Sequence, residues 1–488
     1  MIKNSQAIRL RMVMANELRL LLTDRCFWIV SLLFMLLIGY ALSNGMRQAA
    51  HRTEAQAAIV KDDAARRAQQ ALKLQRIVDG SERPGPFDNP ADPTHMGGGY
   101  GAHHAIMPAA PLAPIALGQD DLFPSQFKVT YNSKVSFISD NDIENPWHLL
   151  SGHFDLAFVV VYLLPFLIFA LSYNLLSGER ESGTLRLLLS QPLALATLLC
   201  GKIATRAGAL LAMALLVPVM TLLLARPETA AGGAAAALCW AATVGAYALF
   251  WFALVLAVNA LGKSSSTNAM ILIVAWVVLV LVVPSLLNLA VTAAVPAPSR
   301  AELATRTRVV TAEAMARNNK LLSTDYEHVG KPGVLLPEQG KLRIAGRLRG
   351  MYKIEREVDD LMQPELDRFD LQQARRQALV SRFSVLSPAA VASEGMSALA
   401  GTGQRRHAWF MAQVANYHAQ WKRFFFPRVD ADRAIGIDDF GRIPKFVWQE
   451  ERAQEVRRQG WLAVMQLLAP SALLLLFAAW RLRRYSVV

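Results

Sequence analysis

Long apolar segments recur along the chain and are separated by polar stretches of very different length. Each is long enough for an α-helix to cross a hydrocarbon core of about 30 Å, which takes roughly 20 residues. The six segments are residues 26–44, 154–176, 198–225, 234–260, 268–295 and 461–480. This pattern predicts an all-α polytopic membrane protein with six transmembrane helices.

The first long polar region, residues 45–153, changes character along its length. Residues 45–78 are rich in Ala, Gln, Lys and Arg and contain no helix breaker, so we expect the first transmembrane helix to continue out of the membrane. Residues 80–124 are dominated by Pro, Gly and His, which predicts loop. Residues 127–138 alternate between apolar and polar types, which favours one or two short strands.

The second long polar region, residues 296–460, is predicted to be mainly helical. Mixed-charge helices are expected at 301–319, 338–385 and 404–426. Gly, Pro and Ser between 387 and 403 are interpreted as an irregular break between them. An aromatic run near the end of the last helix is expected to be core, with membrane contact and partner docking as alternatives: Trp409, Tyr417, Trp421 and Phe424–Phe426.

The composition excludes an ordinary soluble enzyme, because 53% of the residues are hydrophobic and only 18% are charged. A net charge of +13 in a soluble domain would indicate nucleic-acid binding. Here much of the excess flanks apolar segments, as anchoring in a lipid bilayer requires, so no nucleic-acid partner is expected. The three cysteines lie in or beside the apolar segments, so they predict no disulfide framework in the polar regions.

Residues 1–25 are basic and carry an apolar stripe at helical spacing, which predicts a helix lying in the membrane interface. The stripe consists of Ile8, Met12, Ala15, Leu18 and Leu22. A cleaved signal peptide is the competing interpretation, but no convincing small-residue cleavage site follows Ser43.

Short loops set the expected orientation of the protein, because Lys and Arg accumulate on the cytoplasmic side. Basic residues are concentrated in residues 1–25, in and just after the loop 177–197, and in the tail 481–488, whereas the opposite short loop contains only Arg226. Both termini and the 177–197 loop are therefore predicted to be cytoplasmic. The two long polar regions are predicted to be extracytoplasmic, since long loops translocate largely regardless of charge.

The loop between the second and third spans has the pattern of a short helix at a membrane face. It begins with a turn at Gly178 and a charged cluster, followed by an amphipathic segment from Gly183 to Ser190 that Pro192 stops. The cluster consists of Glu179, Arg180 and Glu181, and the apolar face of Leu185, Leu188 and Leu189. Glutamates near a helix start complement its dipole and are suited to basic groups on a partner.

Nucleotide-binding motifs are missing from the sequence. Residues 257–264 match the end of a phosphate loop, but Ala257 replaces the glycine that the backbone cradle requires. The segment also ends a span rather than following a strand. No cofactor is therefore expected in this chain, and any ATP hydrolysis must be carried out by another polypeptide.

The sequence from Ser177 to Pro192, followed by Gly201-Lys202, resembles the cytoplasmic signature of type-2 ABC transporter permeases. The Leu386-Ser-Pro388 and Leu399–Gly403 pieces resemble a bacterial subgroup with enlarged exterior regions after spans one and five. The resemblance covers the whole chain. It implies an inner-membrane dimer of permeases, identical or homologous, seated on two ATPase subunits that carry ATP and Mg.

In such a complex the 177–197 loop is the coupling helix, held in a groove of the ATPase. The residues that the resemblance places in contact with the ATPase are Gly178, Glu179, Arg180, Glu181, Gly183, Thr184, Leu185 and Leu188. The alternative is an interfacial helix that packs only on the protein's own spans.

Prolines interrupt four of the predicted spans, at Pro165, Pro218, Pro284 and Pro470. Each removes a helix hydrogen bond and predicts a kink that would permit rearrangement, although prolines are also common in membrane helices in general. No Asp, Glu, Lys or Arg is expected deep inside a span. This argues against a proton-coupled transporter or an ion channel.

Three histidines in the glycine-rich part of the first polar region are weak candidates for metal ligands: His95, His103 and His104. Their spacing fits no defined site, so no metal centre is predicted.

The sequence thus predicts an ABC permease that couples ATP hydrolysis in a partner chain to transport, with export as the expected direction and no enzymatic activity of its own. One alternative is a force transmitter that acts on periplasmic or outer-membrane proteins without moving cargo. Another is a membrane scaffold or receptor with no ATPase.

Overall fold

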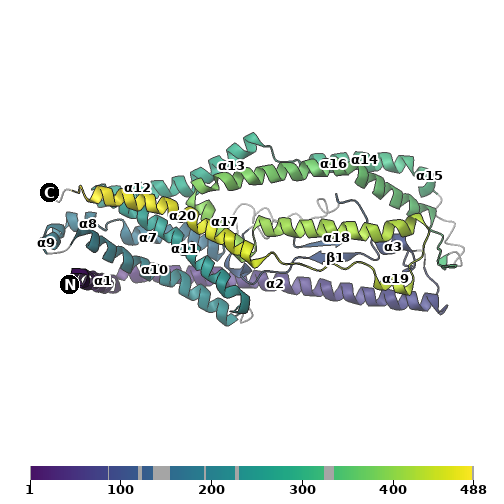
Figure 1. Cartoon of the computed structure of the whole chain (residues 1–488), viewed down its shortest axis with the longest axis horizontal. Coiled ribbons are helices and arrows are strands. Elements are labelled where there is room, and N and C mark those ends of the chain that lie inside the picture. Colours follow the sequence, from purple (N-terminus) through teal and green to yellow (C-terminus); the bar gives the residue numbers. More distant parts are fainter. Residues whose placement is uncertain are drawn as a thin grey trace.

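The computed structural model describes residues 2–85, 87–118, 124–135, 154–191, 194–225, 230–323 and 335–485. The molecule is elongated (Figure 1). A helical bundle occupies one half, and both ends of the chain lie at its tip, which we call the terminal end. The other half, the distal domain, is built from the far part of the first long helix and from the two long polar regions of the sequence.

Within these described residues, six helices are long and apolar enough to span a membrane, so the expected all-α polytopic architecture is confirmed. Two of them are composite: Leu156–Glu181 joins α6 (Leu156–Phe158), η3 (Val159–Leu163), α7 (Leu164–Ser172) and α8 (Ser177–Glu181), and Ser265–Ala294 joins α12 (Ser265–Trp276), η5 (Val277–Val282) and α13 (Val283–Ala294). The others are α2 (Arg25–Val78), α10 (Leu195–Ala225), α11 (Ala230–Asn259) and α20 (Ala453–Leu482).

The centre of the bundle is α11, whose large aromatic side chains are fully buried. Trp240, Tyr247 and Trp251 pack into a core that α7, α10 and α20 also line. By contrast, α12 and α13 bury few of their side chains, and Met270, Leu286 and Leu289 are more than half exposed, as lipid contact requires. The N-terminal helix α1 (Ile2–Thr23) packs along α10.

Two of the four span prolines follow a π-helical turn. Pro165 follows η3 and Pro284 follows η5, and neither proline can donate to a carbonyl in the preceding turn. Hydroxyl groups from other elements donate to carbonyls in these turns instead: Tyr247 to Val161 at 2.7 Å and Ser387 to Leu279 at 2.7 Å. Pro218 and Pro470 lie inside continuous helices.

The first long helix, α2, continues without interruption from the bundle to the distal end, as the sequence predicted. Its 54 residues correspond to about 80 Å of helix (Figure 1). Polar side chains on its distal half bind the polar region that follows: Gln56 donates to the Met107 carbonyl at 2.9 Å, and Gln70 to the Tyr100 carbonyl.

The expectation that residues 80–124 are loop is wrong in part. They contain α3 (Pro93–Gly97), β1 (His103–Ile106) and a 3-10 turn, η1 (Ala113–Ile115). Strand β1 pairs antiparallel with β2 (Gln126–Val129), with His103 opposite Val129. Helix α3 forms because Asp92 caps it, accepting from the Thr94 N–H at 2.7 Å. The predicted strand region also includes residues 136–138, which lie outside the described residues.

The second polar region supplies the three expected helices and several short ones, but the helix expected from residue 338 begins only at Gly346, because residues 338–341 form a turn with a bridge from Lys341 to Arg433. They are α14 (Arg300–Arg317), α15 (Asn319–Leu322), α16 (Gly346–Phe383), η8 (Ser384–Leu386), α17 (Pro388–Ala400), α18 (Gln404–Asp430) and α19 (Ile437–Gly441).

The aromatic run on α18 forms the core of the distal domain, which confirms that interpretation for most of its residues. Trp421 and Phe425 are fully buried, and the Trp421 indole N–H donates to the Gly97 carbonyl at 2.8 Å. A Cβ at Gly97 would lie 2.5 Å from a ring carbon of Tyr131, so this close packing requires glycine. His418, also on α18, is 0% exposed, and its Nε2 lies 2.8 Å from the Asn132 carbonyl oxygen.

Residues 388–400 correct the sequence interpretation, because they form helix α17 rather than an irregular break. The Ser387 hydroxyl accepts from the Ala390 N–H, Pro388 occupies the first turn, and Gly401 ends the helix in the left-handed region at φ 71°. The small side chains that resemble a loop composition pack tightly against α11 and α20 inside the bundle.

Candidate functional site

The segment that the sequence singled out forms two short helices at the terminal end, beside both chain ends (Figure 1). Helix α8 (Ser177–Glu181) ends the second span, and α9 (Thr184–Ser190) corresponds to the predicted amphipathic helix. Gly183 joins them with φ 77°, a left-handed conformation that a side chain would strain. The turn places α9 at the outer edge of the terminal end (Figure 1), with Leu185 packed into the bundle core.

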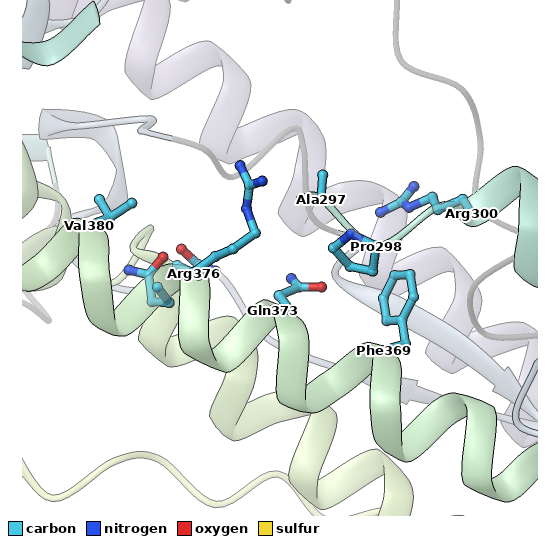
Figure 2. Close-up of a pocket in the computed structure, with 9 residues that line it drawn as sticks. Ala297, Pro298, Arg300, Phe369, Gln373, Arg376 and Val380 are labelled. Carbon is cyan, nitrogen blue, oxygen red and sulfur yellow. The ribbon is translucent and has the colours of Figure 1, made fainter. Parts of the chain in front are cut away.

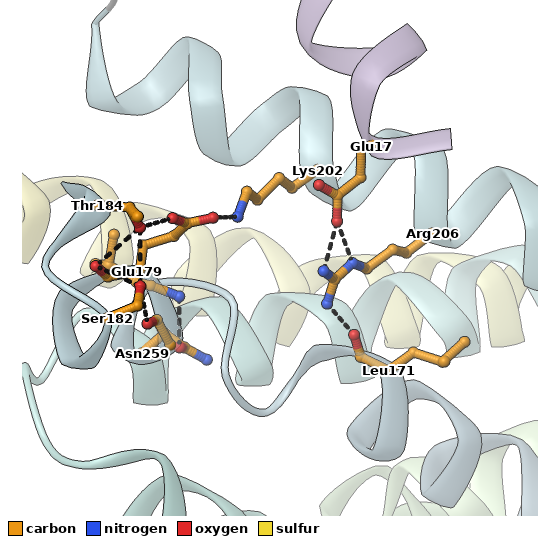
Figure 3. A network of polar contacts seen from close by, with 10 residues as sticks. Glu17, Leu171, Glu179, Ser182, Thr184, Lys202, Arg206 and Asn259 are labelled. Atoms are coloured by element: carbon orange, nitrogen blue, oxygen red, sulfur yellow. Dashed lines mark hydrogen bonds and ion pairs between the residues drawn. The ribbon is translucent and has the colours of Figure 1, made fainter. Parts of the chain in front are cut away.

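Glu179 holds α8 and α9 against α10. Its carboxylate accepts a hydrogen bond from Lys202 Nζ at 2.6 Å and another from the Thr184 hydroxyl (Figure 3). The Lys202 side chain is 9% exposed and that of Glu179 24%, so water screens this pair only in part.

Arg180 connects the same helix to the loop between the fourth and fifth spans. Its guanidinium donates to the Gly262 carbonyl at 2.6 Å and to the Lys263 carbonyl at 3.0 Å. The Tyr485 hydroxyl, near the C-terminus, lies 3.5 Å away. A movement of α8 would therefore pull on the 262–264 turn.

Glu181 binds the start of the fifth span. Its carboxylate accepts from the Ser265 backbone N–H at 2.7 Å and from the Ser265 hydroxyl at 2.8 Å. Ser265 is the first residue of α12, where the free N–H groups of a helix attract negative charge. Asn268, one turn further, donates to the Ser177 hydroxyl at 3.3 Å and strengthens the same junction.

A second ion pair joins α1, α10 and α7. Arg206 donates to the Glu17 carboxylate at 2.7 Å and also to the Leu171 carbonyl (Figure 3). Glu17 is 3% exposed. Arg206 lies about three turns into α10, so the expectation that spans lack internal charge does not hold at this end. The pair cancels the charge within the chain.

Lys202 and Arg206 belong to the basic residues just after the 177–197 loop that set the expected orientation, and Lys202 is also part of the family signature. Their spacing of four residues places both on one face of an otherwise apolar helix. Two basic side chains on an apolar helix indicate that carboxylates of neighbouring segments lie opposite them. The spacing does not reveal that the partners are Glu179 and Glu17.

The outer face of α9 is the part of this site that is open to another protein. Leu187 is 70% exposed and Arg186 is exposed beside it. Leu185 is 1% exposed and packs into the bundle core, while Leu188 is half-buried. Of the predicted contact set, Glu179, Arg180 and Leu185 anchor the helices. The outward-facing Arg186 and Leu187 were not in that set.

The paired glutamates therefore have partners inside the chain. The sequence suggested that the two glutamates bind basic groups of a partner protein. In the structure their carboxylates are bound instead by Lys202 and Ser265 of the same chain. Contact between the α8–α9 segment and an ATPase remains a prediction, which now centres on the exposed residues Arg186 and Leu187.

The three candidate histidines are placed in the distal domain. His103 and His104 lie on β1 with their Nδ1 atoms 3.6 Å and 3.1 Å from the Asp63 carboxylate, and His95 lies on α3 close to Asp92. Burial and the nearby Arg67 lower the pKa of His103 to about 4. Within the ranges that the structure describes, no group of three or more acidic, His or Cys side chains is arranged to hold a metal ion.

Comparison with known proteins bears on the whole chain. A search of curated proteins finds no match. A family model described as ABC-2 family transporter protein matches residues 11–486, nearly the entire sequence, and its extent includes all six spans, the α8–α9 segment and the distal domain. This chain belongs to the ABC-2 family of transporter membrane subunits.

Proposed function

We propose that this chain is a permease subunit that receives ATP-driven movement from a separate ATPase at α9 and passes it to the spans, exporting a substrate across the bacterial inner membrane. In this proposal the terminal end is cytoplasmic and the distal domain is periplasmic. Two permeases, identical or homologous, sit on two ATPase subunits that bind ATP and Mg.

The observation that carries the proposal is the set of bonds that α8 makes. Through Glu179, Arg180 and Glu181 it is tied to α10, to the 262–264 turn and to the start of α12. A displacement of the exposed α9 would therefore reach several spans at once. The family supports the class of protein, and the missing phosphate loop supports a separate ATPase.

The test compares two Arg–Leu pairs that are both exposed at the terminal end. Arg186→Ala with Leu187→Ala removes the outer face of α9, whereas Arg19→Ala with Leu20→Ala makes the same change on α1. We expect the α9 variant to lose a co-purifying ATPase or its transport-linked stimulation, with the α1 variant unaffected. Equal behaviour of the two variants, or wild-type protein that retains no ATPase and so acts as a scaffold or receptor, would contradict the proposal.

One observation favours a second candidate, force transmission to periplasmic or outer-membrane partners. Helix α2 runs unbroken from the bundle to the distal end, and its ion pairs and hydrogen bonds hold the distal domain against it. A probe near the distal end of α2, introduced as Phe87→Cys beside the Lys73–Asp88 ion pair, would report ATP-driven movement; Phe87 is 73% exposed. Movement without release of any cargo would favour force transmission over export.

A further inference from the structure

A cavity of about 290 Å³ lies where the fifth span meets the distal domain. Figure 2 shows Pro298 and Arg300 on one side and Phe369, Gln373 and Arg376 of α16 on the other. Gln404, at the start of α18, completes the lining. No motif in the sequence marked this place, because its residues come from three separate segments.

The lining of the cavity is positively charged. It contains Arg300 and Arg376 and no acidic residue; the nearest acidic residues in the sequence, Glu302 and Asp370, do not line it. Among the described residues no carboxylate forms an ion pair with either guanidinium. Arg376 donates to the Val295 carbonyl at 3.0 Å and lies 3.4 Å from the Thr292 hydroxyl, which fixes its position and leaves further N–H groups to donate.

The cavity also lies at the level where a lipid head group would be. Helix α13 ends the span at Ala294, and the lining begins at Ala297. On the span itself, before its end at Ala294, Leu286 and Leu289 of α13 are 58% and 66% exposed. A ligand with a charged head in the cavity could therefore lay apolar chains along this face. Phe369 and Val380 add apolar surface to the cavity itself.

We propose that this cavity binds the phosphate group of an anionic phospholipid from the adjoining leaflet. A planar guanidinium group binds phosphate through paired hydrogen bonds. The cavity contains two such groups, those of Arg300 and Arg376. A zwitterionic lipid would bring an ammonium group into a cavity that offers it no carboxylate. The inference is independent of ATPase coupling, since it concerns the opposite end of the bundle.

The test measures lipid retention by the full chain in detergent, using native mass spectrometry with phosphatidylglycerol and with phosphatidylcholine. Arg300→Gln removes one charge from the cavity without touching the bonds to Val295. Arg375→Gln is the matched control, because Arg375 is exposed on the same helix and does not line the cavity. Arg376→Gln serves as a second cavity variant.

We expect phosphatidylglycerol to bind in preference to phosphatidylcholine, and Arg300→Gln to weaken it about tenfold, the effect of losing one charge-assisted contact. Arg375→Gln should leave binding unchanged. Equal losses in Arg300→Gln and Arg375→Gln would show diffuse surface attraction and overturn the proposal. Displacement of the lipid by millimolar inorganic phosphate would identify the site as one for free phosphate and overturn the lipid assignment.

Discussion

The ion pair between Glu17 and Arg206 offers a sharp test of how the terminal end is held together. The Glu17 side chain is 3% exposed and that of Arg206 14%, so both charges are largely removed from water. At an effective dielectric constant of about 20, charges roughly 4 Å apart attract by about 4 kcal/mol. Loss of one partner from a buried pair costs about 3–5 kcal/mol, because the other charge remains buried alone.

We therefore expect Glu17→Leu and Arg206→Met each to destabilise the protein by about 3–5 kcal/mol. The double variant should lose only about 1–3 kcal/mol, since an apolar pair replaces the ion pair and the remaining loss is the Leu171 carbonyl left without its donor. Reversible unfolding in mixed micelles would give the free energies for a double-mutant cycle. Additive effects of the two substitutions would refute the reasoning.

Three further predictions concern other parts of the chain. Tyr247→Phe removes the donor to a carbonyl of η3 and should cost about 1–3 kcal/mol, whereas Tyr162→Phe, a half-buried tyrosine with no hydroxyl bond among the described residues, should cost little in the same unfolding assay. Gly183→Ala should strain the α8–α9 turn by about 1–2 kcal/mol, and Gly208→Ala, inside α10 with open space around the new methyl, should not destabilise. Burial lowers the pKa of His418 to about 4, as it does for His103 and His407, so below about pH 6.5 the unfolded chain binds protons that these buried rings do not bind in the folded domain. Each of the three should lower the stability by up to about 1.4 kcal/mol per pH unit from there towards pH 4, and His418→Gln should reduce the slope of the unfolding free energy against pH by the share of one histidine. A pH profile unchanged by that substitution would contradict this assignment.

The spans and the long helix could be predicted because local sequence determines them. Six apolar runs have the length of a membrane, and residues 45–78 contain nothing that would end α2. Helix α17 could not be recognised in the same way. Its Ala, Ser and Gly residues resemble a loop in isolation and become a helix because caps at Ser387 and Gly401 and the surrounding spans select that state.

The candidate site was located by sequence but its chemistry was not. The pattern around Gly178 identified the α8–α9 segment, and its three charged residues were expected to face a partner. Their actual partners, Lys202, Ser265 and the 262–264 turn, are distant in the sequence and follow from packing alone. Periodicity reveals which face of a helix is polar, and only the fold reveals what lies opposite.

The most direct test of the central claim is the side of the membrane from which α9 can be reached. In a background with the exposed cysteines Cys26 and Cys200 replaced by alanine, Leu187→Cys and Phe87→Cys are each labelled with a membrane-impermeant maleimide. The account predicts that Leu187→Cys reacts only from the cytosol, and less when the ATPase is bound, while Phe87→Cys reacts only from outside. Labelling of Leu187→Cys in intact cells would contradict it.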